Sequence, residues 1–431
     1  MKSKADSRVP MVGNKEIRRE LPRWLEGFRE DYEKIFVRPW SPYFGAVLLV
    51  MVSMVLMTSG LSWGVFGGLK LWGDHFNNII GLGTLFGIDE SPDELLLHRI
   101  SLMNINLVLG ALAAALMSSQ FGFRRPPYQE YVWGALGGMC MGIGATLAGG
   151  CTVGGFYSPL LFASPVGWAM GMGLAVGAFL GLKLLVWSMH RIPWGVSATG
   201  GSTAPFPKGL SPFFGIAILI IVLGWTLSWY QSDNKMLVSR AIIIPAGFGF
   251  GFILHRSRFC FARVFREPFM TGDGVRTKAM ILAFCLGIPI ASLFLQNKSV
   301  DPYLVIPATF WLGSILGGLV FGIGMVFAGG CASGALWRMG EGQLKLAVAV
   351  FFFGWSGSVF SGILKHWDVL TPQIDLDFLD GLVEFTKLGY QAYLPDLTGS
   401  WHVTYLICFG VLAGWYAWVR YNESTGRFTI L

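Results

Sequence analysis

The sequence predicts an all-α polytopic membrane protein with about ten transmembrane helices, arranged as two inverted five-helix repeats with short re-entrant half-helices. Its composition, ten long apolar runs and a glycine-rich stretch written twice support this fold class. Of the 431 residues, 53% are hydrophobic and 13% are charged, which excludes an ordinary soluble domain. The 17 Trp and 58 Gly residues suit membrane helices, which tolerate Gly and carry aromatic residues at their ends.

Ten apolar runs have the roughly 18–25 residues that a helix needs to cross a bilayer. The expected spans are 44–66, 100–121, 131–149, 166–188, 213–231, 238–254, 276–296, 304–327, 343–364 and 401–420. Short half-helices or re-entrant loops are expected around 152–162, 258–268 and 334–341. The chain therefore divides into a cytoplasmic amphipathic N-terminal segment at 1–43, a first transmembrane repeat at 44–237, a second at 238–420 and a cytoplasmic tail at 421–431.

Basic and acidic residues alternate from loop to loop, and this pattern predicts the orientation of the chain. The N-terminal segment holds ten Lys or Arg residues, and others fall in 122–130, 189–212, 255–278 and the C-terminal end. Acidic residues fill the long loops 67–99 and 365–400. Because positively charged loops remain in the cytoplasm, both termini should be cytoplasmic. The basic residues form no continuous patch, so the net charge of +7 does not indicate nucleic-acid binding.

The N-terminal segment lacks the apolar core of a signal peptide. Its periodic apolar positions stand beside Arg and Glu residues and are Ile17, Leu21, Trp24, Leu25, Phe28 and Tyr32. This spacing is typical of an amphipathic helix that lies on the inner membrane surface. An ordinary solvated helix fits the same spacing equally well.

The stretch that occurs twice is the most informative feature of the chain. Residues 136–154 read LGGMCMGIGATLAGGCTVG, and residues 316–334, which begin 180 positions later, read LGGLVFGIGMVFAGGCASG. Chance apolar composition would not align two cysteines. The copies fall near the third and eighth spans, so each repeat holds five spans and the second is inverted. Such repeats place a transport site near the membrane midplane, at the interface of the two halves.

Each copy contains the tetrapeptide Ala-Gly-Gly-Cys. Paired Gly residues break a membrane helix and free backbone N–H groups, which is tolerated only where the backbone is buried in protein or lines a cavity. A helix that restarts after the break directs its N-terminal N–H groups at that cavity and favours an anion there. A thiol is a weak donor and a soft acceptor, which suits a sulfur anion. The candidate pathway residues in the two copies are Gly149, Gly150, Cys151, Gly329, Gly330 and Cys331.

Close helix packing through Gly, with a cysteine as filler, is the alternative interpretation of these tetrapeptides. For a single copy, packing would be the simpler explanation. Two copies with their cysteines in register favour the transport site instead.

A third candidate element lies at 247–274, where Ser257 and Cys260 surround a potential helix break and are expected to join the same pathway. Its basic residues either attract an anion or anchor the helix by snorkelling, and snorkelling is the better interpretation for most of them. The residues expected at the inner mouth of the pathway are Arg258, Arg263, Arg338 and Glu341. Arg338 and Glu341 are three positions apart on one helix face, which favours a local ion pair over a gating role.

Other chemistries find no support in the sequence. The six cysteines lie apart in apolar surroundings and form no CxxC pair, so neither a disulfide framework nor a zinc site is expected. No Asp, Glu or His lies in the middle of a span, where a proton or sodium relay would need one. Neither a nucleotide-binding motif nor a thiol–His–acid arrangement is present. We therefore expect no cofactor, no metal and no catalysis.

These motifs resemble the YeeE/YedE family of bacterial membrane proteins, also called the sulfur-transport family. The resemblance spans most of 44–420 and is strongest at LAGGCTVGGFYSPL, RSRFCFARVFREPFMTGD and AGGCASGALWRMGEGQ. It implies a pseudo-symmetric inverted repeat in the bacterial inner membrane, with short helices pointing inward from both sides. It also implies uptake of thiosulfate, or in some members a selenium compound, passed inward by S–H···S contacts. On this chain those roles fall on Cys151, Cys260 and Cys331.

The first half has no cysteine at the place equivalent to Cys260, since residues 57–68 offer Ser59, Gly60 and Ser62 instead. The long loops resemble the YedE branch, so the sequence leaves the substrate open between thiosulfate and a selenium or other sulfur compound. The resemblance implies small TusA-like sulfur carriers as cytoplasmic acceptors. Two other classes stay open: a membrane thiol protein that handles persulfide, and a structural subunit of a larger membrane complex.

Overall fold

The computed structural model describes residue 27 and residues 30–88, 92–191, 202–207, 209–298, 300–371, 373–375 and 383–430. Most of these residues are helical, as the sequence predicts. The elements of the first half are η1 (Glu33–Val37), α2 (Pro42–Met57), α3 (Phe66–Ile79), α4 (Arg99–Met117), β1 (Gly122–Arg125), α5 (Tyr128–Leu147), η2 (Thr152–Tyr157), α6 (Ser158–Leu161), α7 (Pro165–Arg191), β2 (Ser202–Pro205) and α8 (Ser211–Tyr230).

The second half repeats this order of long and short helices. Its elements are α9 (Lys235–Ala241), α10 (Ile243–Ser257), α11 (Phe261–Met270), α12 (Val275–Gln296), η3 (Pro302–Leu304), α13 (Leu312–Ala328), α14 (Ala332–Gly340), α15 (Leu344–His366), β3 (Gln373–Asp375), β4 (Val383–Thr386), β5 (Gly389–Tyr390), α16 (Leu394–Thr398) and α17 (Trp401–Thr425).

Within the described residues, nine helical segments are long and apolar enough to cross a membrane, and the bent pair Glu30–Val37 with Pro42–Met57 makes ten if it counts as one span. The predicted short segments are confirmed as η2 with α6, α11 and α14. Two predicted boundaries were wrong. The span expected at 44–66 ends at Met57, and the span expected at 304–327 begins at Leu312, after Trp311 with a φ of 61°.

A fourth short helix, α3, lies in what the sequence suggested was an outer loop. Hydropathy misses it because it is amphipathic and carries Lys70 and Asp74. Asp74 is buried, where it accepts a hydrogen bond from Ser358 of α15 at 2.6 Å and pairs with Lys70 at 2.8 Å. Both halves therefore contain two half-helices: α3 and η2–α6 in the first, α11 and α14 in the second.

The two copies of the repeated stretch form α5 and α13, which pack against each other in antiparallel directions. A Cβ added at Gly137 would lie 2.4 Å from the Ala328 nitrogen, and one at Gly144 would lie 2.5 Å from the Phe321 nitrogen. Such close approach requires Gly at these positions. The surrounding contacts also come in equivalent pairs, one from each half. The contact between α4 and α10 corresponds to the contact between α12 and α2, and the contact between α5 and α15 corresponds to the contact between α13 and α7. The repeated helices are thus inverted copies at the centre of the molecule.

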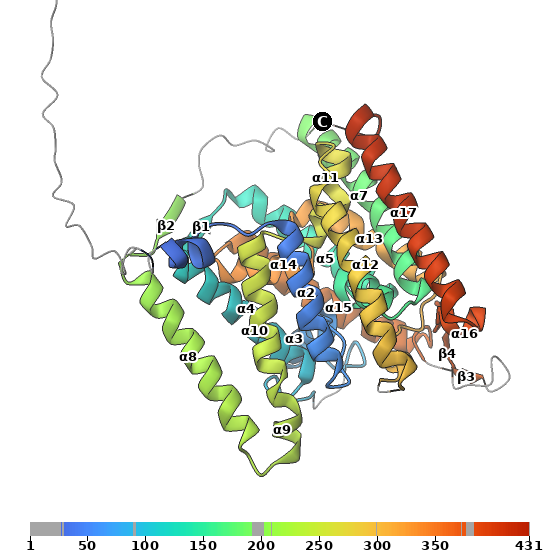
Figure 1. Ribbon diagram of the computed structural model, residues 1–431, viewed down its shortest axis with the longest axis horizontal. Coiled ribbons are helices and arrows are strands. Elements are labelled where there is room, and N and C mark those ends of the chain that lie inside the picture. The colour runs from blue at the N-terminus through green and yellow to red at the C-terminus, as the bar shows by residue number, and fades with distance from the viewer. Residues whose placement is uncertain are drawn as a thin grey trace, which may run out of the picture.

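The peripheral helices α8 and α17 lie at opposite edges of the molecule (Figure 1). Only 11% of the residues in the most apolar stretch of α8, and 22% of those in α17, are buried inside the protein. Both helices therefore present apolar side chains outward, as lipid-facing helices do. Strands β1 and β2 pair with each other and lie toward the end of the molecule that also holds the C-terminus, whereas β3, β4 and α16 lie toward the other end (Figure 1). This separation agrees with the predicted division into basic and acidic loops.

Of the N-terminal segment, the structure describes residue 27 and residues from 30 onward. The Tyr32 hydroxyl donates a hydrogen bond to the Met117 carbonyl at 2.5 Å, and Phe36 packs edge-on against Phe252 of α10. This part of the segment therefore docks on the protein. The other apolar positions of the predicted amphipathic helix, from 17 to 28, lie outside the described residues.

Candidate transport site

Three cysteines occupy the same structural position, immediately before the first residue of a half-helix. Cys151 precedes η2, Cys260 precedes α11 and Cys331 precedes α14. Their exposed fractions are 0%, 1% and 0%. At a helix N-terminus the free N–H groups carry partial positive charge. Each thiol is therefore held where an anion would be favoured.

The two Ala-Gly-Gly-Cys breaks have nearly identical backbones. Gly149 and Gly329 adopt left-handed φ values of 69° and 83°, which only Gly adopts without strain. In each copy the Cys carbonyl accepts a hydrogen bond at 2.7 Å from the nitrogen four residues later. In each copy a second glycine, Gly150 or Gly330, connects the left-handed glycine to the Cys that precedes the half-helix. The repeat therefore specifies one local structure twice.

Cys260 and Cys331 form a thiol pair, with their Sγ atoms 3.9 Å apart. The Gly334 nitrogen donates to the Cys331 Sγ at 3.3 Å, and the Ser333 hydroxyl lies 3.6 Å from the same sulfur. A Cβ at Gly334 would lie 2.7 Å from the Cys260 Sγ, so a side chain at this position would displace the second thiol. The N-termini of α11 and α14 thus meet at two sulfur atoms.

Cys151 has no second thiol beside it. Instead, the thiol interacts with backbone N–H groups at the start of η2 and with those of Val65 and Phe66, which open α3. Val65 caps α3 as Cys260 caps α11. The first-half counterpart of Cys260 is therefore Val65, which lies within the stretch 57–68 where the sequence predicted a counterpart that is not a cysteine.

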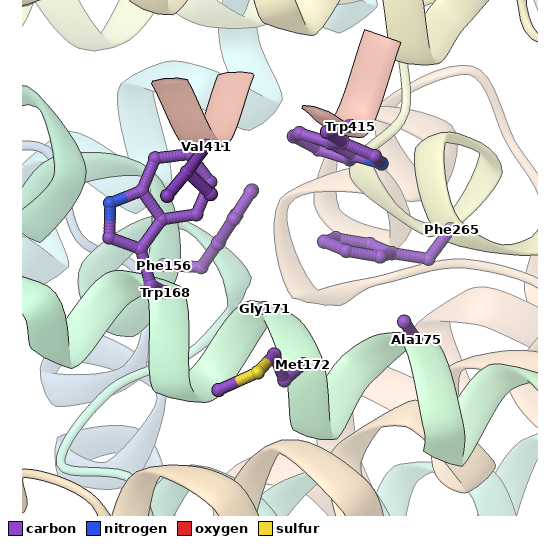
Figure 2. A pocket seen from close by; sticks show the side chains of 8 residues that line it. All are labelled: Phe156, Trp168, Gly171, Met172, Ala175, Phe265, Val411 and Trp415. Carbon is purple, nitrogen blue, oxygen red and sulfur yellow. The ribbon is translucent and has the colours of Figure 1, made fainter. Parts of the chain in front are cut away.

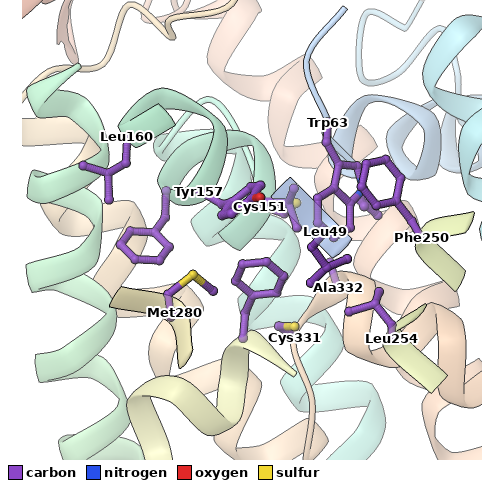
Figure 3. Close-up of a cluster of buried hydrophobic side chains, with 14 of the residues drawn as sticks. Leu49, Trp63, Cys151, Tyr157, Leu160, Phe250, Leu254, Met280, Cys331 and Ala332 are labelled. Atoms are coloured by element: carbon purple, nitrogen blue, oxygen red, sulfur yellow. The ribbon is translucent and has the colours of Figure 1, made fainter. Parts of the chain in front are cut away.

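Aromatic side chains fill the space around the thiols (Figure 3). Trp63 stacks on Phe250 with ring centroids 4.0 Å apart and packs edge-on against Tyr157 and Phe261. Among the described residues, the buried Trp63 Nε1 has no hydrogen-bond partner, and neither do Thr152 Oγ1 and Trp337 Nε1. Unpaired buried polar groups are costly, so these three atoms are candidate contacts for a polar substrate.

Two side cavities next to the half-helices are apolar. One of about 180 Å³ lies against Phe156 of η2 and is lined by Trp168, Phe265 and Trp415 (Figure 2). The other, of about 200 Å³, lies against α3, α14 and α15. Removing an anion from water into such surroundings is strongly unfavourable. Neither of these two cavities therefore suits an anionic substrate.

At the far end of α14, Glu341 is fully buried and forms ion pairs. Its carboxylate lies 3.1 Å from Arg124 and 2.5 Å from Arg258 and accepts a hydrogen bond from Gln343 at 2.6 Å. The His255 Nε2 lies 3.3 Å away. Burial opposes ionisation of Glu341, which lies between α14 and α15, but the contact with His255 and the charges of Arg258 and Arg124 lower its pKa to about 2.

The expected local ion pair between Arg338 and Glu341 was wrong. The Arg338 Nη1 instead donates to the Gly329 carbonyl at 2.9 Å, and its guanidinium lies over the Trp337 ring. The two side chains share a helix face, but Glu341 finds stronger partners that are distant in sequence. Arg338 therefore satisfies a carbonyl that the helix break leaves free.

Two other predicted residues lie apart from the thiols. The Ser257 hydroxyl donates to the Ile253 carbonyl at 2.7 Å and packs against Gly45 of α2. Arg263 pairs with Glu267, which also binds Arg276 at 2.7 Å. Arg266, a further basic residue of α11, is half-buried, and its Nε has no hydrogen-bond partner among the described residues.

Inverted half-helices that meet with their N-termini at buried thiols define a membrane transporter of the inverted-repeat class. Comparison with known protein families identifies the family of transporters to which the chain belongs. The sulphur transport family model matches residues 14–180 and 256–428, so the chain belongs to that family.

Individual relatives differ in how much of the chain they share. The chain is 27% identical over 401 residues to the probable transporter YedE of Escherichia coli, covering 88% of this chain and 93% of that protein. It is 37% identical over 123 residues to the thiosulfate transporter TsuA of Spirochaeta thermophila, covering 28% of this chain and 36% of that protein. The TsuA of Escherichia coli is 34% identical over 105 residues, covering 24% of this chain and 29% of that protein.

Proposed function

We propose that this protein is a permease that imports a small sulfur-containing anion, with thiosulfate as the leading substrate. The pathway runs past Cys151 and the Cys260–Cys331 pair. The observation that carries the proposal is the placement of three buried thiols at half-helix N-termini. Relatives named as thiosulfate transporters support the choice of substrate.

A sulfur dianion that enters a low-dielectric path loses hydration worth many kcal/mol. Backbone N–H groups at the half-helix starts, the thiols and the unpaired Trp63 Nε1 would replace part of that hydration. Each of these donors is weak, and several weak sites in series allow an ion to leave as well as to enter. The thiols thus act as successive S–H contacts, without a covalent intermediate.

The orientation of the protein in the membrane follows from the positive-inside rule. The end that carries β1, β2 and the ion pairs of Glu341 faces the cytoplasm of a bacterial cell, with both termini on that side of the inner membrane. Segments 44–237 and 238–420 form the two transmembrane repeats around the pathway. A small TusA-like sulfur carrier on the cytoplasmic side would accept the anion as it leaves.

The test is uptake of sulfur-labelled thiosulfate into bacterial cells that lack their own sulfur importers. Wild type is compared with Cys331→Ala and with Cys408→Ala, a control that removes an equally buried thiol from α17. We expect uptake to fall by about tenfold or more in Cys331→Ala, since the path loses one contact of a closely spaced pair, and to be unchanged in Cys408→Ala.

Equal uptake in all three proteins would refute the role of Cys331 while leaving transport intact. An inactive wild type that is nevertheless inserted in the membrane would exclude thiosulfate. The same assay with labelled selenite would then test the selenium alternative.

A further inference from the structure

A cleft of about 350 Å³, lined by several charged and polar residues, lies beyond the candidate pathway, where β1 and β2 meet the turn between α14 and α15. Its lining includes Arg124, Arg125, Ser202, Thr203, Gln343 and Lys345. Three of these residues are cationic and three carry neutral groups that can donate hydrogen bonds. This combination is typical of sites that bind oxyanions.

The cations of the cleft are unequally neutralised. Lys345 pairs with Glu130, and Arg124 pairs with Glu341 while its side chain stays 43% exposed. Arg125 is exposed, and no carboxylate among the described residues pairs with it. The cleft therefore carries net positive charge and an arginine that is available to an anion.

The cleft and the Glu341 ion pairs share residues. Arg124 and Gln343 line the cleft and also bind the same Glu341 carboxylate oxygen, at 3.1 and 2.6 Å. The Arg124 nitrogen donates to the Gly342 carbonyl at 2.9 Å, which ties β1 to the α14–α15 turn. An anion bound to Arg124 would therefore compete directly with Glu341.

Glu341 in turn holds the end of α14 against α10. Arg258, which follows α10, binds the second carboxylate oxygen at 2.5 Å, and Arg258 also binds Gln120 of the α4–β1 connection. At the opposite end of α14, Cys331 is the residue that caps the N-terminus of the helix. The same nine-residue helix thus connects the buried thiol pair to the cleft.

We infer that the cleft is a binding site for a small dianionic oxyanion of the sulfate and thiosulfate class. Its occupation draws Arg124 away from Glu341 and loosens the contact that holds α14 closed over the Cys260–Cys331 pair. The place of this site in transport rests on the proposed function, whereas the binding site itself does not.

The experiment measures access to Cys331 in the full-length protein, purified and reconstituted in lipid nanodiscs. N-ethylmaleimide labelling of Cys331 is followed by peptide mass spectrometry, with sodium sulfate or with sodium chloride at the same ionic strength. We expect sulfate to accelerate labelling about fivefold or more in wild type by shifting the population toward an open α14. Chloride at equal ionic strength should leave the rate unchanged.

Arg125→Gln is the decisive variant because Arg125 lies outside the ion pairs that fold α14 against its neighbours. It should abolish the sulfate effect, whereas Arg420→Gln, which removes an exposed cation from α17, should retain it. Glu341→Gln should label rapidly without sulfate. An equal sulfate effect in Arg125→Gln, or none in wild type, would overturn the inference. The assay needs no transport, so its outcome is independent of the uptake experiment.

Discussion

The two Ala-Gly-Gly-Cys breaks share one backbone but lie in different surroundings. Gly149 and Gly329 have the same left-handed conformation. Cys151 and Cys331 both occupy the N-cap position in an extended conformation, but only the Cys331 sulfur accepts a hydrogen bond from its own half-helix. Around the first break, Cys151 is the single thiol, with backbone N–H groups and aromatic rings beside it. Around the second, Cys331 has Cys260 at 3.9 Å.

The charges near the two breaks also differ. At the first break, the Ala148 carbonyl accepts a hydrogen bond from the neutral Thr309 hydroxyl. At the second break, the Gly329 carbonyl accepts a hydrogen bond from the charged Arg338 guanidinium. The half-helix after the second break ends at the buried charges of Glu341. The duplicated backbone therefore provides two helix N-termini that favour an anion. The side chains around the first break are neutral, whereas those around the second include charged groups and a pair of thiols.

The largest expected effect separates the paired thiols from the single one. Mild oxidation with diamide should link Cys260 to Cys331, because their sulfur atoms need to approach by only about 2 Å to reach the disulfide bond length. Wild type should lose two free thiols and all thiosulfate uptake, and reduction should restore both.

In Cys260→Ser the oxidant should leave the number of free thiols unchanged, as judged by mass spectrometry of alkylated protein. Cys151 should stay reduced throughout. Oxidation that links Cys151 to either partner would show that the three thiols come closer together than the structure places them.

A smaller effect concerns the charged end of the second half-helix. The pKa of Glu341 is lowered from 4.5 to about 2, so the ionised carboxylate stabilises the folded state above pH 4.5, and this contribution is lost as the pH falls toward 2. Thermal unfolding should show that Glu341→Gln destabilises the protein by on the order of 3 kcal/mol at pH 7.

The difference between Glu341→Gln and wild type should shrink as the pH falls from 4.5 toward 2. The conservative control is Glu423→Gln, which removes a partly exposed carboxylate paired with Lys278 and Arg420 and should cost roughly 1 kcal/mol or less. A pH-independent difference for Glu341→Gln would mean that the carboxylate is not held by its charged partners.

The smallest effect compares the two glycines. Gly149→Ala and Gly329→Ala both place a Cβ in the left-handed region, which costs roughly 1–2 kcal/mol. At Gly149 the new Cβ would also lie 2.6 Å from the Pro307 Cβ, whereas nothing lies within 4 Å at Gly329. Gly149→Ala should therefore destabilise the protein by about 1–3 kcal/mol more than Gly329→Ala. Equal losses in thermal unfolding would contradict the different packing of the two breaks.

The sequence predicted those parts of the fold that depend on local pattern. Apolar length identified most spans, and the paired glycines located both helix breaks. It did not identify α3 as a half-helix because Lys70 and Asp74 interrupt its apolar character. Asp74 is buried there with Lys70 and with Ser358 of α15 as its partners. Likewise, the choice of Arg338 as the partner of Glu341 relied on spacing along one helix.

By itself, the sequence determined that the chain is a membrane protein built from two inverted copies, with a glycine-broken helix and a cysteine in each. These features follow from composition, hydrophobic length and repetition. Only the tertiary structure decided which residues meet at the breaks. Glu341 binds Arg124 and Arg258, from which it is separated by 217 and 83 positions, and Cys260 reaches Cys331 across 71 positions. Such contacts depend on how inverted helices pack in space, and no local spacing encodes them.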